Sequence, residues 1–183
     1  MGIKTNALKP SFRRFIEDQN MFFVATAAPD GRVNTSPKGL DSLRILSDTK
    51  IVWLSLTGSG NETAAHIAQH PRMTLMFCAF KGDPLILRTY GTARVLHPRD
   101  EEWAEHFARF PNFASARNIY VLDIDLVTTS CGSGVPEMTL DRSRGETELD
   151  PWYGEMGPEK LTAFWEKKNL TSLDGAPTGI FED

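Results

Sequence analysis

Cysteine is scarce in this sequence, and no two cysteines lie close together. Cys78 and Cys131 are the only two among 183 residues, and neither belongs to a CxxC pair. Disulfide frameworks and cysteine zinc sites need several closely spaced cysteines. Histidine offers no replacement, because the one pair at helical spacing, His66 and His70, has no glutamate between them as in HExxH. We therefore expect reduced thiols and no bound metal.

Long apolar runs and an excess of basic charge are also missing. No stretch approaches the roughly 20 apolar residues that span a bilayer, and residues 1–15 lack the apolar core of a signal peptide. The 20 lysines and arginines are outnumbered by 24 acidic residues, giving a net charge of −4. Nucleic acids and anionic membranes are bound by basic patches. The sequence thus predicts a cytoplasmic protein with neither kind of partner.

Short runs of strand-forming residues dominate the first two-thirds of the chain. They cover residues 21–28, 32–39, 43–48, 51–57, 72–80, 85–96 and 118–130. Most are joined by short turns, and Asp-Gly at the first turn is a strong hairpin signal. Apolar residues at helical spacing predict separate helices at 11–20, 61–70 and 99–110. We predict an α+β fold, a small antiparallel β-barrel of about six or seven strands with peripheral helices.

The pattern weakens after residue 135. Residues 148–160 read as a loop and residues 160–169 as a short helix, but four aromatic residues between 152 and 165 are too many for a disordered tail. We predict a barrel domain at 1–135 and an extension at 136–183 that packs on the barrel or on a partner subunit.

The stretch TGSGNET, from Thr57 to Thr63, connects a strand to a helix through a flexible loop. Ser59 and Glu62 have the S-x-x-E spacing of a capping box, in which Glu62 would reach back to the amide of residue 59. Backbone amides at such a helix start also suit a phosphate. From the loop alone, a plain turn and a phosphate site both stay open.

Several motifs taken together resemble the pyridoxamine 5'-phosphate oxidase-like family of FMN-binding split barrels. They are PDGRVNTSPKG, GSGNETAAHIAQHPR, MTLMFCAF and ILRTYGTARVL, and the resemblance covers residues 15–126. The later TTSCGSGVP and KKNLTSLDG look like those of a less characterised bacterial branch. The resemblance implies a split barrel, FMN as cofactor, and a homodimer with the flavin at the interface.

The resemblance also implies where FMN would bind. The strand at 34–39 would run beside the isoalloxazine ring, with Lys38 as the cation at the phosphate. The loop that follows Thr57 would hold the phosphate. The candidate cofactor-binding residues are Asn34, Ser36, Pro37, Lys38, Gly39, Thr57, Ser59, Gly60, Asn61, Glu62, Thr63 and Arg88.

The sequence departs from the family pattern in two places. Glu62 and Thr63 replace an arginine and a lysine, so Arg88 or the pair Arg13 and Arg14 is expected to supply the missing charge. The C-terminal arginine and histidine with which the vitamin B6 oxidases bind substrate have no counterpart in SLDGAPTGIFED. Genuine pyridoxamine phosphate oxidase activity is therefore not expected.

The sequence leaves three functions open and assigns no catalytic residue. The first is an FMN-dependent oxidoreductase that uses NAD(P)H or a small-molecule redox substrate. The second is a non-catalytic flavin carrier or sensor. The third is a cofactor-free dimeric interaction module.

Overall fold

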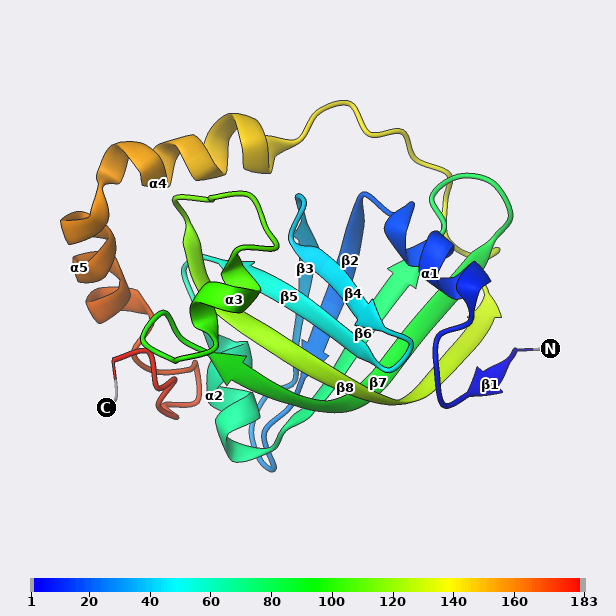
Figure 1. Cartoon of the computed structure of the whole chain (residues 1–183), viewed down its shortest axis with the longest axis horizontal. Coiled ribbons are helices and arrows are strands. Elements are labelled where there is room, and N and C mark those ends of the chain that lie inside the picture. The colour runs from blue at the N-terminus through cyan, green and yellow to red at the C-terminus, as the bar shows by residue number, and fades with distance from the viewer. Residues whose placement is uncertain (1, 182–183) are drawn as a thin grey trace.

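The computed structural model describes residues 2–181 as a curled antiparallel sheet with helices around it (Figure 1). The strands are β1 (Lys4–Thr5), β2 (Met21–Thr26), β3 (Asn34–Gly39), β4 (Leu43–Ser47), β5 (Lys50–Leu56), β6 (Arg72–Cys78), β7 (Leu85–Leu96) and β8 (Ala116–Cys131). Their order is β3-β2-β6-β7-β8-β5-β4, with β1 paired to β8. Because β3 and β4 are the two ends of this order, the barrel stays open between them.

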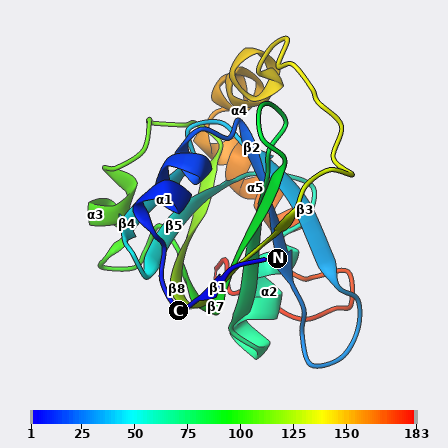
Figure 2. The ribbon, with the colours of Figure 1, turned by 90° about the vertical axis from the view of Figure 1, so that its right-hand side faces the viewer.

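The helices pack around the outside of the barrel (Figure 1). They are α1 (Pro10–Glu17), α2 (Glu62–Gln69), α3 (Trp103–Phe107), the π-helix η1 (Gly145–Leu149), α4 (Asp150–Met156) and α5 (Pro158–Lys168). After β8 the chain crosses over the barrel to reach α4 and α5 (Figure 1). The turned view places α2 at the opposite end of the molecule from α4 (Figure 2). Among residues 2–181, no helix has the combined length and apolar character needed to cross a membrane.

The predicted antiparallel barrel is confirmed, but the loop predicted at 148–160 is wrong. That stretch contains α4 and the start of α5. Pro151 and Pro158 occupy the first turns of these helices, where a missing N–H removes no helical hydrogen bond. Gly157 separates the helices with a φ of 75°. The prolines therefore mark helix starts instead of breaks.

Strand β5 is buried on both faces, as its nearly continuous apolar sequence indicates. Ile51 and Trp53 belong to the core inside the barrel, together with residues of β2, β6, β7 and β8. Val52 and Leu54 belong to a second cluster, which includes side chains of the α3 region. Burial on both faces fixes the position of β5, and the end of β5 leads into the loop at residues 57–61.

The pairing of β5 with β8 contains an irregularity that matters for the site. Ser55 pairs with Asn118 and Leu56 pairs with Ala116, so Arg117 is an extra residue on β8. Such a bulge breaks the alternation of side chains between the two faces of a sheet and re-aims a side chain. Arg117 is thereby freed from the face that strand alternation would assign to it.

A second irregularity generates a prediction about stability. The register of β7 against β8 shifts between Tyr90 and Gly91, and a Cβ at Gly91 would lie 1.9 Å from the carbonyl oxygen of Asp123. Gly91→Ala should therefore lower the free energy of unfolding by about 1 to 3 kcal/mol, measured by urea titration. Gly134→Ala is the matched control, because nothing lies within 4 Å of its added Cβ. Equal urea midpoints for the two variants would contradict the prediction.

Candidate functional site

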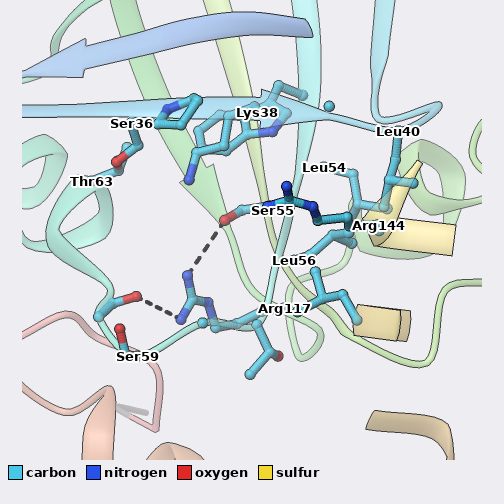
Figure 3. Close-up of a pocket in the computed structure, with 18 of the residues that line it drawn as sticks. Ser36, Lys38, Leu40, Leu54, Ser55, Leu56, Ser59, Thr63, Arg117 and Arg144 are labelled. Carbon is cyan, nitrogen blue, oxygen red and sulfur yellow. Dashed lines mark hydrogen bonds between the residues drawn. The ribbon is translucent and has the colours of Figure 1, made fainter. Parts of the chain in front are cut away.

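A cleft of about 790 Å³ lies beside β3 and β5, bounded by the loop at residues 57–61 and by the segment that crosses the barrel (Figure 3). This volume is within the range of about 300 to 1,000 Å³ that is usual for small-molecule sites. Leu54 and Leu56 line it from β5, and Leu40, Leu140 and Leu149 line it from outside β5. The cleft thus combines apolar walls with the polar groups described below.

The structure brings all but one of the predicted site residues to this cleft. Its lining includes Asn34, Ser36, Pro37, Lys38, Gly39, Thr57, Ser59, Gly60, Asn61, Glu62 and Thr63. Arg88 is the exception. Its guanidinium lies outside the cleft and donates to the Ser130 hydroxyl at 3.1 Å, because Arg88 alternates with the buried Leu87 and Thr89 on β7. Arg88 therefore does not replace the missing cations.

The pair Arg13 and Arg14 does not reach the cleft either. Arg13 forms an ion pair with Asp48 at 3.0 Å, and neither arginine is part of the cleft lining. Both lie on α1, which covers the barrel with Phe12 and Ile16. Within one chain, neither Arg13 nor Arg14 therefore contributes its charge to the cleft.

The loop after β5 opens toward free space. Thr57 is buried, and its amide donates to the carbonyl of Ser115 at 2.6 Å. Nothing lies within 4 Å of a Cβ built on Gly58, and Ser59 and Gly60 are exposed. The chain then enters α2 at Glu62, so the unpaired amides of the first helical turn lie beside the cleft.

The predicted capping box is absent. Asn61 is the N-cap of α2, which makes Glu62 the first helical residue, whereas a capping box needs the glutamate at the third. The Glu62 carboxylate instead accepts the backbone N–H of Leu173, at 2.9 and 3.0 Å from its two oxygens. The prediction that Glu62 reaches back to residue 59 is therefore wrong, and Glu62 binds the C-terminal segment.

Arg117 is a cation of the cleft that sequence reasoning missed. Only 4% of it is exposed, and burial lowers the pKa of its guanidinium, which remains charged at neutral pH. Its Nη1 donates to the carbonyl oxygen of Gly60 at 2.9 Å and to Oδ1 of Asn169 at 2.6 Å, and its Nη2 lies 3.5 Å from the Ser55 hydroxyl. All these acceptors are neutral.

Lys38 is the second cation of the cleft. It projects from β3 over the ring of Trp53, with Nζ 5.3 Å from the ring centroid. Burial, and secondarily the positive charge of Arg117, lower the pKa of Lys38 to about 8. Within residues 2–181, neither Lys38 nor Arg117 forms an ion pair with a carboxylate. Figure 3 shows both side chains directed into the cleft.

Two buried donors at the cleft have no partner in the described part of the chain. They are Nε of Arg117 and Nδ2 of Asn61. An unsatisfied buried donor loses free energy of about 1 to 3 kcal/mol relative to water. Both atoms are shielded from solvent, so a ligand in the cleft cannot reach them as the side chains stand. The groups that suit an anion such as a phosphate are the loop amides and the two cations.

The remaining polar and aromatic groups shape the walls. Asn34 donates to the Thr63 hydroxyl at 3.3 Å and accepts from Ser36, also at 3.3 Å, which links β3 to α2. Tyr120 stacks on Trp53, and burial raises the pKa of its phenol to about 12. Tyr120 is therefore neutral at physiological pH and forms part of an aromatic wall.

The segment that crosses the barrel contributes two arginines that the sequence reading did not consider. Arg142 is paired with Glu148 at 2.7 Å, whereas Arg144 has no carboxylate partner among residues 2–181. Figure 3 shows Arg144 extending over the cleft. Elsewhere in the described residues, no three His, Cys, Asp or Glu side chains gather as a metal ion would require.

Arg117 left only a weak signal in the sequence. It stands two residues before the apolar run from Ile119 to Leu122, where a charged residue indicates the end of a strand. Strand alternation would place it with Ile119 and Val121, away from Tyr120. Because of the bulge, Arg117 faces the cleft together with Tyr120. The sequence does contain one signal for Arg117. It is a charged residue at the start of a strand that is buried on both faces.

Comparisons with known proteins agree with this fold. Residues 8–131 match the model of the family described as pyridoxamine 5'-phosphate oxidase. A relative from Aspergillus flavus, the pyridoxamine 5'-phosphate oxidase family protein ustO, is 37% identical over 193 residues, covering 97% of this chain and 78% of that protein.

Two crystal structures are similar to the barrel. One is a candidate pyridoxamine 5'-phosphate oxidase from Lactobacillus delbrueckii, with a TM-score of 0.54 and 25% identity over 67% of this chain and 94% of that chain. The other, a protein of the pyridoxinephosphate oxidase family from Clostridium acetobutylicum, has a TM-score of 0.53 and 13% identity, over 66% of this chain and 86% of that chain. The second shows likeness of fold alone.

The lowered pKa of Lys38 predicts how stability depends on pH. An unfolded lysine titrates near 10.5 and the folded Lys38 near 8, so the unfolded chain binds more protons between these values. Stability should therefore rise with pH from about 8 to 10.5. Lys38→Met, which removes a buried cation, should stabilise the apoprotein by about 1 to 3 kcal/mol at pH 7. This gain should shrink toward pH 10.5.

Urea titrations across this pH range measure the effect. Lys81→Met is the control, because Lys81 is an exposed lysine on a turn. Equal changes in the free energy of unfolding for both variants at every pH would refute the idea that the buried Lys38 cation lowers stability.

Proposed function

This chain belongs to the pyridoxamine 5'-phosphate oxidase family, and from that premise we propose that it is an FMN-binding oxidoreductase. FMN would occupy the cleft, with its phosphate at the loop of residues 57–61 and its ring between β3 and β5. The reaction would pass electrons between NAD(P)H or a small-molecule redox substrate and the flavin.

The observation that carries the proposal is the pair of cations without carboxylate partners. The phosphate of FMN has a charge of about −1.5 to −2 at neutral pH, as other phosphate monoesters do. Lys38 and Arg117 together supply two positive charges in a cleft whose loop, residues 57–61, has none. The residues present therefore fit a phosphate monoester.

The other part of the cleft fits a flat, partly apolar ring. Leu40, Leu56, Leu140 and Leu149 line the cleft, are at least partly exposed and provide apolar surface. The edge strand β3 has no strand on its outer side within the described sheet, so its outward amides are available to the polar atoms of the ring. FMN, when bound, supplies the acceptance and release of an electron pair. The chain supplies binding, orientation and exclusion of water.

A non-catalytic flavin carrier or sensor is the second candidate. It is favoured by the chemistry of the lining, which within residues 2–181 contains no histidine or aspartate. Tyr120 does not ionise near neutral pH, and Lys38 is the lining group whose pKa of about 8 suits proton transfer. Anaerobic addition of NADH or NADPH separates the two functions. An oxidoreductase should reduce its flavin rapidly and lose the yellow colour, whereas a carrier or sensor should stay yellow.

Cofactor release and titration test the proposal directly. The purified protein should be yellow, and mass spectrometry of the released cofactor should identify FMN. Lys38→Met should weaken FMN by about 1.5 to 3 kcal/mol, because a charge-assisted contact to the phosphate is lost. Lys81→Met should bind FMN as the wild type does. A colourless protein that does not take up added FMN would refute the proposal.

We also propose that the protein is a homodimer with the flavin at the subunit interface. The family resemblance implies this arrangement, and Val33 and Trp152 are large apolar side chains that are exposed on a single chain. Light scattering after size-exclusion chromatography should give twice the mass of 20.4 kDa. A monomer that retains FMN at micromolar concentration would contradict this proposal.

A further inference from the structure

Asn169 is a buried connection between Arg117 and the loop of residues 57–61. It directly follows α5, and its exposed fraction is 0%. Its Oδ1 accepts from Arg117 Nη1 at 2.6 Å, and its Nδ2 donates to the carbonyl oxygen of Gly58 at 3.0 Å. Its own carbonyl accepts the Thr178 hydroxyl at 2.5 Å. The side-chain amide of one residue therefore fixes both the guanidinium and the loop.

The same C-terminal segment holds the loop at two other points. The indole N–H of Trp165 donates to the Thr57 hydroxyl at 3.0 Å, at the start of the loop. The amide of Leu173 donates to Glu62, at its end. Residues 165–173 thus contact the loop from its first residue to the start of α2. These residues lie outside the range 8–131 that matches the family model.

The neutrality of Asn169 matters for the charge of Arg117. A carboxylate at this position would form an ion pair with the guanidinium and would cancel its attraction for an anion. The amide orients Arg117 through a hydrogen bond and leaves the full positive charge available. The size and donor pattern of asparagine also allow the second bond to Gly58, which an acceptor-only carboxylate cannot make.

We propose that Asn169 and Trp165 are positioning residues of the phosphate site, and that residues 165–173 form its outer half. This inference rests on the proposed binding of FMN. Neither residue is required to touch the cofactor. Asn169 acts through Arg117 and Gly58, and Trp165 acts through Thr57. Phosphate affinity therefore depends on a segment that follows the barrel by more than thirty residues, from Cys131 to Trp165.

The first experiment compares FMN with riboflavin, which has the same ring and no phosphate. Asn169→Asp should weaken FMN by about ten-fold or more, because a charge-assisted contact is neutralised. Riboflavin affinity should change by less than about two-fold, since the ring contacts are untouched. Asn112→Asp is the matched control, since it makes the same change at an exposed loop residue outside the cleft. Fluorescence quenching measures both ligands.

Trp165→Phe provides a second, milder variant. It keeps an aromatic ring beside Phe181 and removes the N–H that reaches Thr57, together with part of the indole. FMN should weaken by about three- to ten-fold, again with riboflavin unchanged. Trp103→Phe is its control, because Trp103 lies on α3, stacks on Phe107 and does not line the cleft. This variant keeps the inference testable if Asn169→Asp fails to fold.

Binding should also protect the segment that assists it. Trypsin can cut after Lys167 and Lys168, which are exposed at the end of α5. Saturating FMN should slow this cleavage in the wild type, whereas saturating riboflavin should slow it much less.

The possible outcomes separate the two claims. Wild-type affinity for FMN in both Asn169→Asp and Trp165→Phe would overturn the inference while leaving FMN binding intact. A parallel loss of FMN and riboflavin would assign the residues a purely structural role and would also overturn it. A wild type that binds no FMN would remove the proposed function, and the inference would fall with it.

Discussion

The site depends on how a buried guanidinium is held without a negative partner. Removing a charge from water is costly, and most buried arginines are matched by a carboxylate. Arg117 is matched by a backbone carbonyl, an asparagine amide and a hydroxyl. Each acceptor comes from a different part of the chain, namely the loop after β5, the residue after α5, and β5 itself. The bulge in β8, the position of that loop and the docking of the C-terminal segment all meet this single requirement. The remaining free charge is what suits the cleft to an anion.

Seen from this requirement, the departure from the family pattern at Glu62 and Thr63 is a relocation of charge. The resemblance implies cations in the first turn of α2, whereas this chain places its cations on two strands, Lys38 on β3 and Arg117 on β8. The first turn of α2 can then carry side chains with other partners. Glu62 binds the amide of Leu173, and Thr63 accepts from Asn34. A carboxylate near an anion site is tolerable because its oxygens are engaged by a backbone donor. Glu62 therefore contributes to the attachment of the C-terminal segment.

Local sequence signals predicted the barrel because they depend on neighbouring residues. Asp30-Gly31 indicates a hairpin and hence the pairing of two strands. The nearly continuous apolar sequence of β5 indicates burial on both faces. The candidate residues came from the family resemblance, and most of residues 34–39 and 57–63 line one cleft because each segment is continuous in the chain. Arg117 could not be found in this way, since its orientation depends on a one-residue shift between strands far apart in sequence. Asn169 and Leu173 were beyond reach for the same reason. Asn169 contacts Gly58 and Leu173 contacts Glu62, each across more than a hundred residues. Asn169 and Arg117 are about fifty residues apart.

The late position of Asn169 in the chain also has a consequence for biosynthesis. During translation the N-terminal part of a protein emerges first and folds first. All eight strands have been made once the ribosome has passed Cys131, so the barrel can form while residues 165–173 are still untranslated. At that stage Arg117 lacks its closest acceptor and Thr57 lacks its indole donor. A prematurely terminated chain would then resemble the finished protein in fold but would hold a phosphate poorly. Loading of the cofactor would thereby distinguish completed chains from truncated ones.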